Sequence, residues 1–106
     1  MDLSADVVEP LAETFHLLGE ANRLRLVLAC LEGSENVHTL AERAGISASL
    51  ASHHLRLLRA SRILRPERRG REVRYALADE HVRALVENMV VHLGEDTGDD
   101  TGRPAR

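Results

Sequence analysis

The chain has 106 residues, which is enough for one domain and not for two. Hydrophobic residues make up 43% of it, charged residues 29% and aromatic residues only 2%, which argues against a disordered or fibrous chain and predicts an aliphatic core. No apolar run reaches the roughly 20 residues that span a bilayer, and the acidic N-terminus does not resemble a signal peptide. We therefore expect a cytoplasmic protein without a membrane partner.

The cysteine count limits the metal chemistry. Cys30 is the single cysteine, so the chain can form no intramolecular disulfide and no paired-thiolate zinc site. A metal site, if present, must use histidines and carboxylates.

The net charge of −3 hides an uneven distribution. Between Arg43 and Arg74 there are nine Arg against two acids, giving +7, whereas the remainder has five Arg against fifteen acids, giving −10. A basic stretch on an acidic body points to a polyanion as partner. A solvated charged face is the alternative reading.

The first half of the chain shows helical periodicity. Apolar residues repeat at intervals of three and four, which predicts helices over 5–18 and 21–32, the second closed by Gly33. A short helix over 37–44 follows, then Gly45, then a longer helix that Ser47 caps and that runs to Ala60. Two helices joined by a short turn with glycine form a helix-turn-helix.

The second half predicts a β-hairpin and a last helix. Residues 63–66 and 73–77 alternate with period two around a polar tip at 67–71, so the fold class is mainly α with a small β-hairpin, a winged helix. A final amphipathic helix starts near Asp79 and ends at Gly94. We expect one folded domain over 1–95 and a disordered acidic tail over 96–106.

The helix that starts at Ser47 carries residue types that suit DNA reading. A helix in the major groove presents short polar side chains near its N-terminus, with basic groups beside them. The candidates here are Ser47, Ser49, Ser52, His53 and Arg56, of which the last four share one face, and Arg68, Arg69 and Arg71 at the hairpin tip would reach phosphates or the minor groove. The serines could instead only cap and solvate a surface helix, but the fold and the local charge together favour DNA.

The stretch from Phe15 to Leu93 resembles the ArsR/SmtB family of bacterial winged-helix metal-sensing repressors. The matching segments are LGEANRLRLVLACL, LAERAGISASLASHHLRLLRASRIL and RRGREVRYAL. The resemblance implies that the first and last helices build a homodimer, so that 1–95 is both a DNA-binding and a dimerisation domain. It also implies that recognition helix and wing bind a palindromic operator, with Ser49, Ser52 and His53 at positions that touch DNA.

The last helix carries a candidate metal site. His81 and His92 are eleven residues apart, about 16 Å along a helix, so one helix cannot place both on one ion. If two copies pack antiparallel across a two-fold axis, Asp79 and His81 of one meet His92 and Glu95 of the other. Two imidazoles and two carboxylates suit Zn²⁺. The pattern resembles the last-helix zinc-sensing branch of the family.

Each of these ligands also has an ordinary structural explanation. Asp79 is a good N-cap, His81 could be a solvated residue of the first turn, and His92 suits the C-terminal end of a helix. Gly94 would end the helix before Glu95, in which case Asp96 is a possible substitute. The family's other site, a cysteine pair, has no counterpart in residues 35–39, which disfavours arsenic, cadmium or lead.

The sequence thus predicts a metal-responsive repressor whose metal-free dimer binds its operator and whose Zn(II)-bound form releases it. The alternatives are a Ni(II) or Co(II) sensor that uses the same site, and a family repressor without a metal response. An enzyme is disfavoured, because four protein ligands leave no open position for water and no general base stands out.

Overall fold

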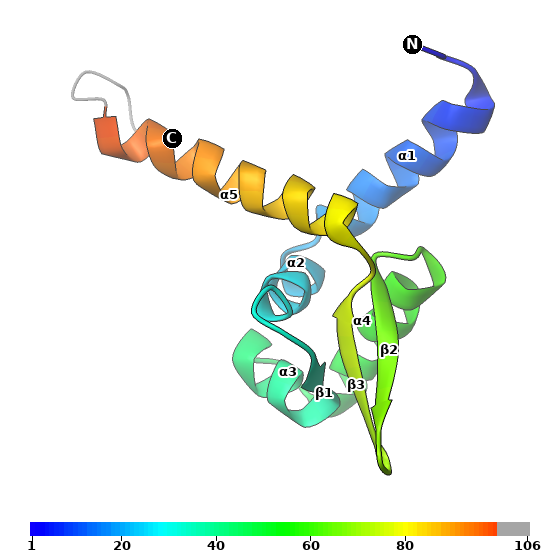
Figure 1. Cartoon of the computed structure of the whole chain (residues 1–106), viewed down its shortest axis with the longest axis vertical. Helices are drawn as coiled ribbons and strands as arrows, with labels where there is room; N and C mark the ends of the chain where they lie inside the picture. The colour runs from blue at the N-terminus through cyan, green and yellow to red at the C-terminus, as the bar shows by residue number, and fades with distance from the viewer. Residues whose placement is uncertain (100–106) are drawn as a thin grey trace.

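The computed structural model describes residues 1–99, with side chains through residue 95 (Figure 1). The elements are α1 (Ala5–Leu18), α2 (Ala21–Ala29), β1 (Glu35–Asn36), α3 (Val37–Ala44), α4 (Ala48–Ala60), β2 (Leu64–Arg69), β3 (Glu72–Leu77) and α5 (Glu80–Asp99). This order confirms the winged helix. No helix of the described part is both long and apolar enough to cross a membrane.

A small antiparallel sheet forms the wing. Its strand order is β1-β3-β2, and β2 pairs with β3 from Leu64 opposite Leu77 to Arg69 opposite Glu72. The hairpin turn is therefore only two residues long. Gly70, its first residue, has a φ of 64°, the left-handed conformation that glycine adopts without steric cost.

The sheet differs from the sequence prediction in two respects. Residues 67–69 belong to β2 rather than to a polar tip, so the hairpin is longer and its tip sharper than expected. Strand β1 was not predicted, because its two residues carry no periodic signal and pair with β3 about 40 positions along the chain. This pairing attaches the start of α3 to the wing.

The core is aliphatic, as the composition predicts. Its fully buried large side chains come from α2, α3, α4 and the start of the wing, and they are Leu26, Val27, Leu40, Leu55, Leu58, Ile63 and Leu64, with Cys30 among them. Burial of such side chains supplies about 1.5–3 kcal/mol each and holds the helix-turn-helix against the wing. Helix α4 is therefore held in place along its buried face.

The helix-turn-helix is held by three local devices. The Asn36 side chain accepts a hydrogen bond from the Thr39 backbone N–H at 2.8 Å, and Ser47 accepts one from Leu50 at 3.1 Å. Gly45 closes α3 with a φ of 72°. The Asn36 cap fixes where α3 begins, and Gly45 with the Ser47 cap fixes where α4 begins, which decides the face that α4 presents.

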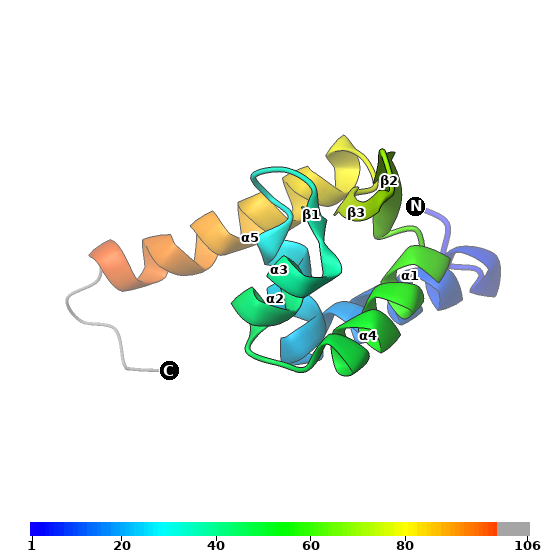
Figure 2. The same ribbon diagram turned by 90° about the horizontal axis from the view of Figure 1, so that it is seen from below.

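Helices α1 and α5 extend from the body as two diverging arms (Figures 1 and 2). The prediction that the last helix ends at Gly94 is wrong, since α5 continues to Asp99. Residues 96–99, predicted as disordered tail, are therefore helical, while the rest of that tail lies outside the described residues. Helix α2 ends at Ala29, three residues earlier than predicted.

Candidate nucleic-acid interface and metal-binding residues

Helix α4 has one face buried in the core and one polar face. Ala51, Leu55 and Leu58 are buried, whereas Ser49, His53 and Arg56 are exposed and Ser52 is partly exposed. The predicted polar face thus faces solvent. The Ser47 side-chain oxygen is engaged in capping α4, so this serine has a structural role besides any contact with DNA.

The wing carries arginines that differ in their surroundings. Arg68 and Arg71 are exposed, and no ion pair joins either to an acid among the described residues. Arg69 is also exposed, but its Nη2 lies 3.7 Å from Glu67, which pairs with Arg65 at 3.2 Å. Arg68 and Arg71 therefore offer the charge that a phosphate could use most readily, and Arg69 offers less.

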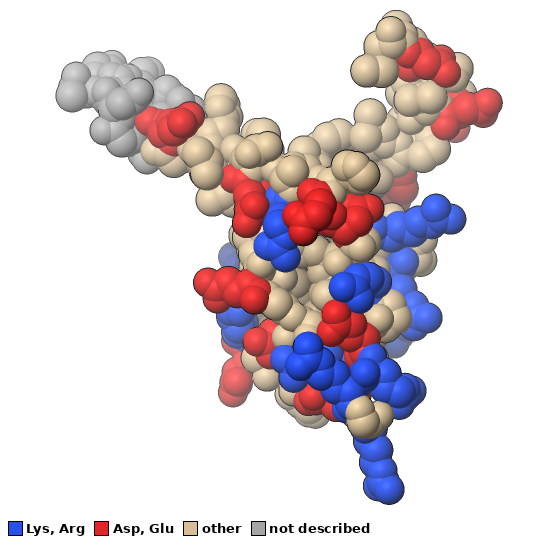
Figure 3. Space-filling model, in the orientation of Figure 1, with Lys and Arg blue, Asp and Glu red and all other residues tan. Residues whose placement is uncertain are grey.

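Two other arginines of the basic stretch form hydrogen bonds within the protein and stabilise the fold. Arg74 donates to Ser34 and lies 3.2 Å from Glu72, and Arg43 donates to the Ala29 carbonyl at 3.0 Å. The count of +7 therefore overstates the charge that is open to a partner. Even so, basic side chains gather around the wing and the lower body with some acids among them, while the arms carry mostly acids (Figure 3).

Two further arginines, Arg59 and Arg62, are exposed and were not among the predicted DNA-binding residues. Neither forms an ion pair within the part of the chain that the structure describes. Arg59 follows Arg56 by three positions, so helical spacing could have found it. Arg62 has a φ of 62°, a left-handed conformation rare outside glycine, because the Ile63 and Arg62 N–H groups bond back to the Leu58 and Arg59 carbonyls and close α4.

The recognition helix also contains a buried histidine. His54 is 7% exposed, and its Nδ1 has no hydrogen-bond partner among the described residues. Its Nε2 lies 3.9 Å from Glu20, the residue that caps α2 by accepting from the Arg23 N–H. Burial lowers the pKa of His54, and the charge of Glu20 opposes this shift.

Asp79 and His81 lie together at the start of α5. One Asp79 oxygen accepts the Val82 N–H at 3.0 Å, and the other lies 3.7 Å from His81 Nδ1. The Val82 hydrogen bond holds the pKa of Asp79 below its usual value, so the carboxylate stays charged. The His81 side chain is 98% exposed, which leaves it open to a ligand.

His92 and Glu95 lie far along the same helix and are also exposed. Because α5 is helical through Gly94, Glu95 lies on the helix three residues after His92. Within the described residues no three His, Cys, Asp or Glu side chains gather as a metal site. One chain thus carries two separate pairs of nitrogen and oxygen donors, each of a kind that Zn²⁺ accepts.

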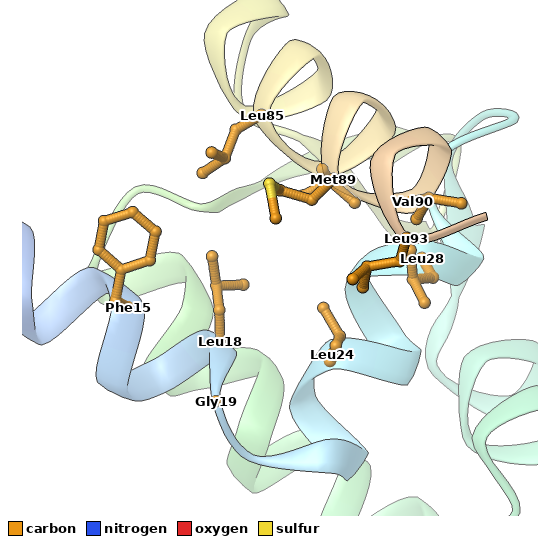
Figure 4. A pocket seen from close by; sticks show the side chains of 10 residues that line it. Phe15, Leu18, Gly19, Leu24, Leu28, Leu85, Met89, Val90 and Leu93 are labelled. Atoms are coloured by element: carbon orange, nitrogen blue, oxygen red, sulfur yellow. The ribbon is translucent and has the colours of Figure 1, made fainter. Parts of the chain in front are cut away.

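An apolar hollow of about 310 Å³ lies between α1, α2 and α5 (Figure 4). Phe15 and Leu18 approach it from α1, and Leu85, Met89 and Leu93 from α5. Phe15, Met89 and Leu93 are about half exposed, together with Val7, Val8, Leu11 and Val90. Such a contiguous apolar surface is typical of a protein interface.

Comparison with known proteins agrees with this arrangement. Residues 20–65 match the family model described as "Bacterial regulatory protein, arsR family". The chain is 40% identical over 93 residues to a transcriptional repressor SmtB homolog of Synechocystis, covering 88% of this chain and 70% of that protein. It is 36% identical over 95 residues to a cadmium resistance regulatory protein, a CadC homolog of Staphylococcus aureus, covering 89% and 78%.

A solved structure shares the whole fold. It is the homodimeric winged helix-turn-helix DNA-binding domain of Mb0332 from Mycobacterium bovis, a possible ArsR-family regulator. The TM-score is 0.85 at 22% sequence identity, with 98% of this chain and 96% of that one covered. The similar proteins are regulators of transcription, not enzymes.

Proposed function

Because this chain belongs to the ArsR/SmtB family of winged-helix transcriptional regulators, we propose that it is a metal-responsive repressor that acts as a homodimer. Its metal-free form binds a palindromic operator, and Zn(II) held between the last helices releases the DNA. The observation that carries this proposal is the division of four residues that can bind metal into two exposed pairs, one at the start of α5 and one farther along it.

The homodimer follows from the apolar surface of the arms. Half-exposed apolar side chains on α1 and α5, such as Phe15 and Met89, would be withdrawn from water against a second copy. The similar domain of Mb0332 is described as homodimeric, which supports the same assembly here. Two-fold symmetry would place two reading helices on the two halves of a palindrome.

The DNA contacts are assigned to α4 and the wing. The major groove would receive the exposed polar side chains of α4, which are Ser49, Ser52, His53 and Arg56. The Ser47 hydroxyl would donate a hydrogen bond to the DNA from the N-cap of α4. Arg68 and Arg71 would bind phosphates or reach the minor groove, and Arg69 would add a weaker contact, because it shares Glu67 with Arg65.

The metal site needs both copies. In an antiparallel pair of α5 helices, Asp79 and His81 of one copy would face His92 and Glu95 of the other, giving two equivalent sites. A bound Zn²⁺ would supply positive charge that links the two helices. Co(II) or Ni(II) at this site is the alternative, and one similar protein is named for cadmium resistance.

The start of α5 is well placed to influence the DNA-binding elements. Only one residue, Ala78, separates Asp79 from β3, so Asp79 and His81 follow the wing closely in the chain. Arg83 of α5 also donates to the Leu31 carbonyl in the loop after α2. By thermodynamic linkage, the factor by which metal lowers DNA affinity must equal the factor by which DNA lowers metal affinity.

The test is a fluorescence anisotropy titration of operator DNA with and without Zn²⁺. The variants H81Q and H92Q should bind DNA like the wild type but keep it when zinc is added, whereas H38Q, an exposed histidine of α3, should still release it. If zinc still releases the H81Q/H92Q double variant, the site lies elsewhere. If zinc leaves wild-type binding unchanged, the protein is a repressor without this response.

A comparison of metals completes the test. Titration with Zn²⁺, Co²⁺ and Ni²⁺ in turn would rank them by the operator affinity they remove. The optical spectrum of the cobalt form would report the coordination number, four for the ligand set proposed here. A six-coordinate spectrum would favour the nickel or cobalt alternative.

A further inference from the structure

A basic notch lies at the end of α4, away from the polar face already described. Arg59, Arg62 and Arg65 line a hollow of about 400 Å³ that Ala78 and Asp79 close on the side of α5. All three arginines are exposed, and only Arg65 forms an ion pair, with Glu67, in the part of the chain that the structure describes. The notch thus offers at least two guanidinium groups without an acidic partner.

The position of the notch separates it from the DNA-reading end. Arg59 lies ten residues after Ser49, which is about 15 Å along the helix axis. The loop from α4 to β2 lies beside the start of α5, at the end of the body opposite to the wing tip (Figure 1). A partner for this notch should therefore come from the side of α5.

We propose that the notch binds the acidic segment 96–100 of the second copy, which directly follows Glu95. This proposal rests on the antiparallel pairing of α5 helices in the proposed function. In that pairing His92 and Glu95 of the second copy lie near Asp79, and Asp79 itself lines the notch. Helix α5 continues seven residues beyond His92, about 10 Å, which in this pairing would carry its end beyond Asp79 of the first copy.

The charges of the two surfaces are complementary. Residues 96–100 contain three acids and no basic residue. Against them stand the three arginines of the notch, of which one already has an acidic partner, and a single acid of the lining, Asp79. Each exposed pair contributes little alone, but the two-fold axis repeats every pair, so the segment acts as a second, salt-sensitive clamp on the dimer.

Cross-linking tests the contact directly. Full-length chains that carry R62C are mixed with chains that carry D99C, allowed to exchange in the absence of metal, and oxidised. A disulfide between the two variants should form well above the level of a control mixture of R25C with D99C, since Arg25 is exposed elsewhere, on α2. Cys30 should not interfere, because burial raises the pKa of its thiol to about 12. Equal yields in both mixtures would overturn the proposal.

Charge exchange gives a second readout, the dimer dissociation constant from sedimentation at low and high salt. R59E/R62E should raise that constant about tenfold or more at low salt and much less at high salt. D99R/D100R should do the same, while combining the four changes should restore affinity and R25E should have little effect. Unchanged dimer affinity in R59E/R62E, with weaker operator binding, would make the notch a phosphate contact and overturn the proposal.

These experiments separate this proposal from the proposed function. The H81Q/H92Q variant without metal should still give the cross-link, because the tail contact uses other residues. If the cross-link forms while zinc has no effect on DNA binding, the tail contact holds and the metal response fails. If zinc releases DNA but no cross-link forms, the metal response holds and the tail contact fails.

Discussion

Arg74 of the wing holds Ser34, the residue just before β1, by two hydrogen bonds. Its Nε donates to Ser34 Oγ at 3.0 Å and its Nη2 to the Ser34 carbonyl at 2.6 Å. Glu72 and Glu35 add their charges at 3.2 Å and 3.8 Å. The arginine therefore joins the wing to the segment that leads into α3, and it belongs to the fold rather than to the DNA-binding surface.

Replacing Arg74 should cost stability, and replacing Arg68 should not. R74A removes two charge-assisted hydrogen bonds in a partly buried position, so the free energy of unfolding should fall by about 1–3 kcal/mol. R68A removes an exposed arginine without an ion pair in the described residues and should change it by less than about 0.5 kcal/mol. Urea denaturation measures both; equal effects would contradict the assignment of roles.

Operator binding should depend on salt in proportion to the arginines that are free to reach phosphates. The slope of log affinity against log salt should become shallower by about one for each phosphate that is no longer neutralised, hence by about two for R68A or R71A in a symmetric dimer. R69A should change it less, because Arg69 shares Glu67 with Arg65. Anisotropy titrations at several salt concentrations test this order, and an unchanged slope in both R68A and R71A would exclude the wing as a DNA clamp.

Arg62 should be a site of stabilisation. Its left-handed conformation costs a non-glycine residue about 1 kcal/mol or more, so R62G should raise the free energy of unfolding by about 0.5–1 kcal/mol relative to R62A. The comparison with R62A removes the effect of deleting the arginine side chain from the result. As a control in the opposite direction, G45A should lose about 1 kcal/mol, because Gly45 also has a positive φ. Thermal or urea unfolding of the three variants measures these differences.

His54 should make stability depend on pH. Since burial lowers its pKa in the folded state, the unfolded chain binds the proton more readily, and stability falls as pH drops below about 6.5. Above that pH the histidine is neutral in both states and contributes no slope. Unfolding of H54Q at pH 7 and pH 5 should show a smaller loss than the wild type, while H53Q, which changes the exposed neighbour, should follow the wild type. Parallel curves for H54Q and the wild type would contradict this.

Most elements could be predicted because their signals are local. The cap at Ser47, the glycine at position 45 and the periodicity of α4 each act within a few residues, and each appears in the structure where the sequence placed it. Strand β1 depends on a distant partner and left no local signal. Gly94 misled the prediction of the helix end, since a glycine in a long helix costs only about 1 kcal/mol, which does not stop it.

The candidate sites could be predicted only in part. The polar face of α4 follows from spacing, but the surroundings of each arginine do not. Arg74 and Arg68 are both arginines of the same basic stretch, and nothing in the sequence distinguishes them. Only the structure shows that Arg74 donates to Ser34 while Arg68 is exposed. The candidate metal ligands are a different case, because their spacing in the sequence predicts the two pairs, while the described part of a single chain does not bring them together.

The cap of α5 gives Asp79 two tasks. One oxygen is tied to the Val82 backbone, so a cation arriving at this carboxylate would meet a single oxygen already oriented by the beginning of a helix. Little freedom remains to be lost when it binds. Asparagine caps helices equally well but carries no charge. The variant D79N would therefore keep the start of α5 intact while lowering the affinity for a cation, which would separate the capping role of Asp79 from its proposed metal-binding role.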